Sequence, residues 1–171
     1  EAHSMQPVTI ALRDLDIHIQ ARSIVIVRGN TATKTYSDPD DCARELHWYT
    51  TVPWAAPDLV DHGPRHLVMA AHPIASGLSD YRPVDELRDL LERLERRGIS
   101  HRDVHTGNVV ATDDGPRLID WETAIDIPGY DLGGPASDIP VPAIHDGEAM
   151  WWNADHPQAI GTAWGMPVDE D

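Results

Sequence analysis

The 171-residue sequence has one cysteine, one lysine and no phenylalanine, and it lacks long apolar runs. A single cysteine, Cys42, excludes an internal disulfide, and no CxxC or Cys/His pairing predicts a structural zinc site. No run approaches the roughly 18 apolar residues of a membrane helix, and no secretory signal segment opens the chain. We therefore expect a cytoplasmic protein without membrane contact. Residues 1–4, before Met5, are interpreted as a cloning remnant.

Positive charge is also scarce. The chain has 13 basic and 29 acidic residues, a formal net charge of -16, so a nucleic-acid backbone would be repelled and is not an expected partner. Twelve of the basic residues are arginine, and Lys34 is the only lysine. Because lysine and arginine are not interchangeable at a tight anionic site, Lys34 becomes a candidate ligand for an anion.

The first half of the sequence predicts an antiparallel sheet and one helix. Short β-branched or alternating segments indicate five strands, and a break at Asp14 leaves open whether the first segment is one strand or two. Ser37 or Asp38 as N-cap, with Pro39 at the first helical position, is typical of a helix start, and this helix should run to about Thr50 with Glu45 on its face. The segments predicted as strands are residues 8–20, 23–28, 31–36, 58–61 and 65–71.

The second half contains the clearest helix, from Pro83 to Gly98. Its leucines recur at spacings of three and four, and Gly98 is typical of a helix C-terminus. A loop closing on a short strand should follow over residues 99–110. The turn at residues 113–115 then leads into a returning strand over residues 116–119.

Three polar residues after this helix are spaced in a pattern that carries chemistry. His101-Arg102-Asp103 is followed by Asn108, and Asp120 ends the next predicted strand, seventeen residues after Asp103. This arrangement resembles the catalytic loop and metal-binding aspartate of the protein-kinase-like superfamily, H-R-D-x-x-x-x-N followed by D-F-G. The resemblance implies a phosphotransferase that uses ATP and Mg²⁺.

The resemblance also implies a role for each residue. Asp103 would accept or orient the proton of a substrate hydroxyl, while Asn108 and Asp120 would hold Mg²⁺. Lys34 would reach the α and β phosphates of ATP, and Glu45 on the following helix would hold Lys34 in place. Asp41, on the same helix, competes with Glu45 for this position.

The sequence departs from protein kinases in its phosphate loop. No glycine-rich loop is present, because the first hairpin carries Ile19-Gln20-Ala21-Arg22-Ser23. Phosphates would be covered by backbone amides, Ser23 or Arg22.

The loop motif itself is mixed. His105-Thr106-Gly107-Asn108 and Asp120-Trp121-Glu122 resemble aminoglycoside and choline phosphotransferases, whereas Arg102 is typical of protein kinases. His105 is either a cation near the γ-phosphate or a neutral histidine bonded to Glu122 or to backbone. Arg102 is expected to pair with Glu122 or with Asp131, an aspartate that would brace the loop.

The expected fold is α+β and two-lobed. A single kinase-like domain would span residues 5–171, with a five-stranded antiparallel N-lobe over residues 5–74 and a reduced helical C-lobe over residues 75–171. A partner chain could complete this C-lobe.

The function first expected is a minimal protein Ser/Thr kinase, because the Pro- and Gly-rich tail after Glu122 offers little wall for a small acceptor. The alternative is a small-molecule phosphotransferase with Trp151, Trp152 and Trp164 folded over the cleft, acting on a hydroxyl-bearing compound. A nucleotide-binding pseudokinase is the third hypothesis.

Overall fold

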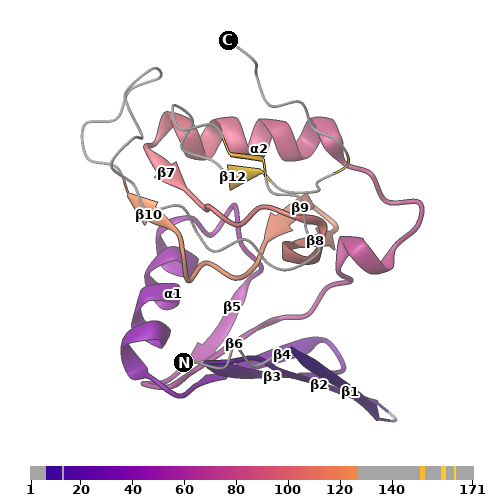
Figure 1. Cartoon of the computed structure of the whole chain (residues 1–171), viewed down its shortest axis with the longest axis vertical. Coiled ribbons are helices and arrows are strands. Elements are labelled where there is room, and N and C mark those ends of the chain that lie inside the picture. Colours follow the sequence, from indigo (N-terminus) through magenta and orange to yellow (C-terminus); the bar gives the residue numbers. More distant parts are fainter. Residues whose placement is uncertain (1–6, 13, 127–150, 153–158, 161–163, 165–171) are drawn as a thin grey trace. The chain divides into compact units, whose positions relative to one another are not determined.

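A computed structural model describes residues 7–12, 14–126, 151–152, 159–160 and 164 (Figure 1). The chain divides into two compact units, residues 1–72 and residues 73–171. The predicted cloning remnant, residues 1–4, and Asp131 lie outside the described residues.

The first unit contains one antiparallel sheet of six strands. Their order across the sheet is β1-β2-β3-β4-β6-β5. The predicted count of five was one too low, because the segment before Ile19 forms two strands separated by a turn at Asp14, whose φ is 64°. Aspartate is among the few residues that tolerate this left-handed conformation. The strands are β1 (Val8–Leu12), β2 (Leu15–Ile19), β3 (Ser23–Arg28), β4 (Thr31–Tyr36), β5 (Leu59–His62) and β6 (His66–Ala70).

Helix α1 (Pro39–Thr51) packs against β4, β5 and β6 on one side of the sheet (Figure 1). It begins where predicted, because the Asp38 side chain accepts a hydrogen bond of 2.8 Å from the Asp40 backbone N–H. The core between helix and sheet is aromatic and aliphatic: Trp48 and Tyr49 of α1 pack in the same buried layer as Leu67 of β6. This layer holds β4 and α1 in register, which positions their polar side chains.

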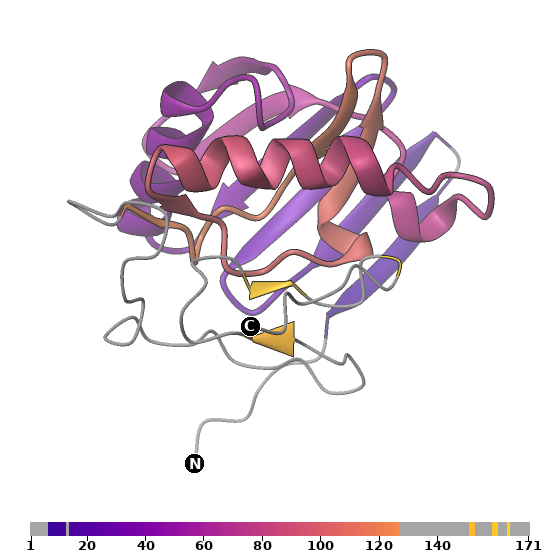
Figure 2. The same cartoon turned by 90° about the horizontal axis from the view of Figure 1, so that it is seen from above.

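The second unit is built around helix α2 (Val84–Arg96), which packs against β7 and β9 (Figure 2). The predicted leucine stripe is its buried face: Leu87 and Leu94 have no exposed surface. β7 pairs with β10, and β8 forms a hairpin with β9. The remaining elements are η1 (Ala75–Gly77), β7 (Ile99–Ser100), η2 (Thr106–Asn108), β8 (Val109–Thr112), β9 (Gly115–Leu118) and β10 (Ile125–Asp126).

The described part of the tail is small. Trp151 and Trp152 form β11 (Trp151–Trp152), which pairs with β12 (Ala159–Ile160). The ring of Trp164 meets Tyr81 edge-on, with 6.4 Å between ring centroids. Among the described residues, the helices are all too short or too polar to cross a membrane.

Candidate active site

In the first unit, the only lysine of the chain forms a buried ion pair. Lys34 lies on β4, a central strand of the sheet, and its Nζ donates a hydrogen bond to Glu45 Oε1 of α1. The Lys34 and Glu45 side chains are 3% and 0% exposed. A charge buried to this degree is tolerated only with a partner, so each side chain requires the other.

Two titratable side chains near this pair, Tyr36 and Cys42, are stabilised in their uncharged forms. The Tyr36 ring centroid lies 5.3 Å from Lys34 Nζ. Burial, and then the Glu45 carboxylate, raise the pKa of the Tyr36 phenol far above its usual range. Burial likewise raises the pKa of the Cys42 thiol, and Glu45 adds to this effect. Two of the side chains around the pair, Tyr36 and Cys42, are therefore held in their uncharged forms.

The competing carboxylate, Asp41, has other partners. Its two oxygens lie 3.3 Å from Arg44 and 3.9 Å from Arg22, and both arginine side chains are at least half exposed. Glu45, and not Asp41, is the partner of Lys34.

Ser23, one of the two side chains expected to cover phosphates, is buried and donates a hydrogen bond of 3.1 Å to Gln20 Oε1.

In the second unit, His101 ties the loop after β7 to the end of β9. Its Nε2 donates a hydrogen bond of 2.8 Å to the Ile119 carbonyl, and its Nδ1 accepts one of 3.2 Å from the Asp103 backbone N–H. The side chain has no exposed surface, and burial lowers the pKa of His101, so the imidazole is neutral. Its ring meets Trp121 edge-on at 4.7 Å between centroids. This histidine fixes the backbone on which Asp103 stands.

Asn108 fixes the Asp103 carboxylate. Its Nδ2 donates to the Asp103 carbonyl at 2.9 Å and to Asp103 Oδ2 at 3.0 Å. Both hydrogens of the amide nitrogen are used in this way, so Oδ1 is the atom of Asn108 that remains for a cation. The Ile119 N–H donates to the Asn108 carbonyl at 2.9 Å, which joins the loop to the segment that carries Asp120.

His105 faces the same carboxylate from the other side. Its Nδ1 accepts a hydrogen bond of 3.1 Å from the Gly107 backbone N–H, so the ring hydrogen is on Nε2. This Nε2 lies 3.8 Å from Asp103 Oδ1. A Cβ on residue 107 would meet the His105 ring at 2.9 Å, which is too close. Gly107 therefore makes room for the position of His105.

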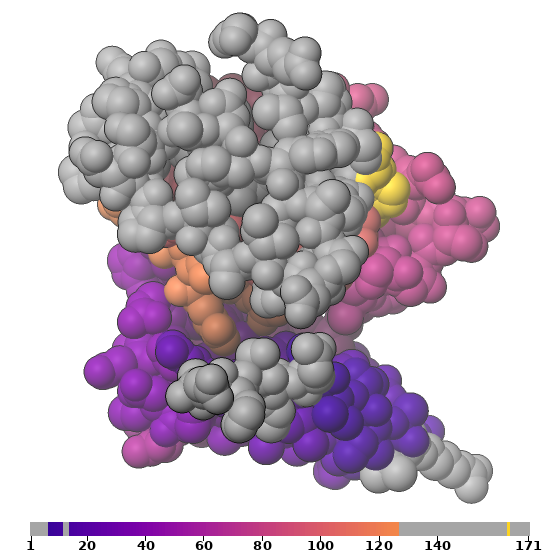
Figure 3. All heavy atoms as spheres, in the orientation of Figure 1, coloured from indigo at the N-terminus to yellow at the C-terminus, as the bar shows by residue number. Residues whose placement is uncertain are grey.

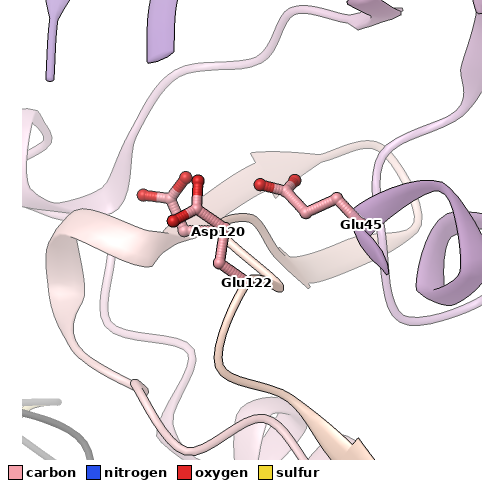
Figure 4. Close-up of side chains that lie close together, drawn as sticks. All are labelled: Glu45, Asp120 and Glu122. Carbon is pink, nitrogen blue, oxygen red and sulfur yellow. The ribbon is translucent and has the colours of Figure 1, made fainter. Parts of the chain in front are cut away.

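Two carboxylates follow β9, on either side of a buried tryptophan. Trp121 has no exposed surface, and its Nε1 donates to the Leu118 carbonyl at 2.8 Å. Asp120 has a left-handed backbone, with φ of 58°. A carboxylate oxygen of Asp120 lies within 4.8 Å of one of Glu122, and Figure 4 shows these two carboxylates close together.

Glu122 was missed as a metal-ligand candidate, although the sequence carried a signal in the alternation of Asp120, Trp121 and Glu122. The amide oxygen of Asn108 and the carboxylates of Asp120 and Glu122 are hard oxygen donors, which fit Mg²⁺. Among the described residues of the second unit, these three are side chains that could hold this ion.

Arg102 has the least expected environment. Its φ of 72° is left-handed, a strained conformation for a long side chain, and it lets the Asp103 N–H turn back to His101. Arg102 is 6% exposed, and burial lowers its pKa. Within the part of the chain that the structure describes, Arg102 forms no ion pair with Glu122.

Comparisons with known proteins agree with this arrangement. The profile of the phosphotransferase enzyme family, APH, matches residues 33–160, which is more than half of the chain. No curated protein sequence matches the chain at a significant level.

Solved structures show the same fold. The crystal structure of WbdD aligns with a TM-score of 0.52 and 18% identity over 72% of this chain and 37% of its own. The Rio2 kinase of Chaetomium thermophilum, in a complex with ADP/Mg²⁺ and phosphoaspartate, aligns with a TM-score of 0.50 and 12% identity. That alignment covers 70% of this chain and 48% of the Rio2 chain, so this chain spans less than half the length of either structure.

These likenesses establish an α+β protein-kinase-like fold, as predicted. The family match covers Lys34, Glu45, the loop from His101 to Asn108, and Asp120. The chain belongs to the phosphotransferase enzyme family.

Proposed function

We propose that this chain transfers the γ-phosphate of Mg²⁺-bound ATP to an alcohol hydroxyl, with Asp103 orienting that hydroxyl and accepting its proton. The observation that carries the proposal is the pair of hydrogen bonds from Asn108 Nδ2 to Asp103. They hold one carboxylate oxygen in place while His105 Nε2 faces the other at 3.8 Å. A carboxylate held through one oxygen and its own backbone carbonyl has a fixed direction, which phosphoryl transfer requires of the group that positions the nucleophile.

The other residues would bind the nucleotide. Lys34, held by Glu45, would place one positive charge against the non-transferred phosphates, and the buried surroundings would strengthen that attraction. The Asn108 amide oxygen and the Asp120 and Glu122 carboxylates would hold Mg²⁺. The ion, when bound, neutralises charge on the phosphates. Each of these side chains lies within the range that the family profile matches.

We propose a small hydroxyl-bearing molecule as the acceptor, in place of the protein first expected. The expectation of a protein acceptor depended on the tail after Glu122, and most of that tail lies outside the described residues. His105, Gly107 and the Trp121-Glu122 pair resemble the motifs of small-molecule phosphotransferases, and this resemblance supports the proposal. Arg102 is the one residue that favours a protein acceptor, which makes a protein kinase the second candidate.

A label-transfer assay tests the proposal. The protein is incubated with γ-labelled ATP and Mg²⁺, in parallel with an aminoglycoside, choline, a sugar alcohol and a mixture of Ser/Thr-rich proteins. Asp103→Asn and Asp120→Asn remove the orienting carboxylate and a metal ligand. Asp113→Asn, in the exposed turn between β8 and β9, makes the same chemical change away from the site and is the matched control.

We expect label on a small acceptor with the wild type and with Asp113→Asn, and none with the two site variants. Label on proteins alone would make a protein the acceptor and a small molecule the second candidate. The proposed phosphate transfer itself would stand. An absence of transfer and of ATP hydrolysis, together with thermal stabilisation by ATP and Mg²⁺, would refute phosphotransfer and indicate a pseudokinase.

A further inference from the structure

The two faces of the six-stranded sheet differ in an unusual way. Alternate residues of a strand lie on the same face, and the strand register then shows which residues of neighbouring strands share it. The face that we call the isoleucine face comprises Val8, Ile10, Leu15, Ile17, Ile19, Ile24, Ile26, Arg28, Thr31, Thr33, Thr35, His66, Val68 and Ala70.

Helix α1 packs on the opposite face. The residues of that face include Lys34, which pairs with Glu45 of α1, and the buried Leu67 and Met69. A sheet with one face on a core and one in water normally turns its apolar residues toward the core and its polar residues outward. Here the aliphatic stripe of β1, β2 and β3 is turned away from α1.

The isoleucine face is open at its aliphatic positions. Val8, Ile10, Ile24 and Ile26 keep between 37% and 47% of their surface exposed. The atoms of the first strands, coloured indigo, reach the surface of the molecule in the view of Figure 3. Adjacent exposed β-branched side chains form an apolar patch, and such patches mark sites of association.

The charge of this face sets it apart from the rest of the chain. Its residues on β1 to β4 and β6 include no aspartate or glutamate, although the chain has 29 acidic residues and a net charge of -16. Arg28 and His66 lie near opposite corners, and Asp61, opposite Val68 on the edge strand β5, lies at the margin. Two copies of this chain repel each other over most of their acidic surface, but two isoleucine faces carry only the Asp61 carboxylates, at their margins.

We propose that the isoleucine face binds a second copy of this chain, sheet against sheet, about a two-fold axis. A two-fold interface uses the same patch on both subunits, so the patch must be compatible with itself, as a neutral apolar face is. A basic partner would be attracted to the acidic surfaces instead.

The size of the face predicts a weak dimer. Five strands about 4.8 Å apart, each about five residues long with a rise of about 3.4 Å per residue, cover roughly 400 Å². Standard interfaces bury about 800 Å² on each partner, so we expect dissociation constants in the micromolar range or weaker. The association should therefore depend on concentration within the range that can be measured.

Sedimentation velocity of the full chain, from low to several hundred micromolar, tests this proposal. The wild type should shift from monomer toward dimer as its concentration rises. Ile26→Glu places a carboxylate at the middle of the face in both copies and should remove the shift. Leu78→Glu is the matched control, because Leu78 is 36% exposed, as Ile26 is 37% exposed, but lies in the second unit.

A milder variant guards against loss of folding. Ile24→Thr/Ile26→Thr keeps β-branched side chains, which strands favour, and should weaken dimerisation while its thermal unfolding stays cooperative. A wild type that stays monomeric at every concentration overturns the proposal. Dimerisation of Ile26→Glu at wild-type strength, or its loss in Leu78→Glu, overturns it as well.

Discussion

Removal of one charge from the Lys34–Glu45 pair should destabilise the protein strongly. Lys34→Met leaves the Glu45 carboxylate, which has no exposed surface, without its ammonium partner, and Glu45→Gln does the converse. Loss of one partner of a buried pair costs about 3–5 kcal/mol. The total free energy of unfolding of a protein domain is about 5–15 kcal/mol. The single variants should therefore remain folded only at low temperature and low urea concentration.

The double variant Lys34→Met/Glu45→Gln separates stability from activity. With both charges removed and the side-chain volumes nearly kept, it should recover most of the stability lost in each single variant. Urea titration monitored by tryptophan fluorescence measures this, since Trp48 is buried on the same helix as Glu45. Phosphate transfer should stay absent in the double variant, because Lys34, the side chain proposed to bind the non-transferred phosphates, has lost its charge.

An ion pair of the same helix whose cation is half exposed is the control for this cycle. Arg44 and Asp41 lie 3.3 Å apart with the arginine half exposed, so Arg44→Met should cost at most about 1 kcal/mol. If Lys34→Met costs no more than Arg44→Met, the reasoning from burial is refuted. Recovery of phosphate transfer in the double variant would refute the role of Lys34 in binding the nucleotide.

Three further predictions concern the loop and the buried titrating groups. Gly107→Ala should displace the His105 ring and lower kcat about 10- to 100-fold in steady-state assays, while Gly77→Ala, with open space around it, should not. Tyr36 has a raised pKa when folded, so its stability contribution is complete below about pH 10 and is lost above it; urea unfolding should show a steeper alkaline loss in the wild type than in Tyr36→Phe. His101 has a lowered pKa when folded, so its contribution is complete above about pH 6.5 and is lost as the pH falls; His101→Gln should flatten the acid limb of the same pH series.

Local sequence patterns predicted most of the helices and strands, because residue spacing and helix-start residues are read from a single segment of the chain. The leucine spacing between Pro83 and Gly98 predicted α2, and Asp38-Pro39 predicted the start of α1 to the residue. The break at Asp14 was predicted, but the segments before and after it were not counted as two separate strands. A single residue with positive φ, at 64°, decided between five strands and six.

The candidate active-site residues could be predicted from the sequence for a different reason. Spacing alone placed Asp103 and Asn108 on one short loop, five residues apart, where hydrogen bonds can join them. The lone lysine was visible through the composition of the chain. Glu122 was missed because the neighbouring Trp121 had to be known as buried before the carboxylates on either side could be assigned to a common surface.

The sequence by itself determined which residues share a face, a loop or a helix, because these depend on periods of two and 3.6 residues along one segment. Only the tertiary structure decided which face is covered. The isoleucines of β1, β2 and β3 alternate as core strands do, yet α1 packs on the side of Lys34, because the buried ion pair and the layer of Trp48 and Leu67 lie there. Burial is a property of what packs on a segment, and that partner is distant in the sequence.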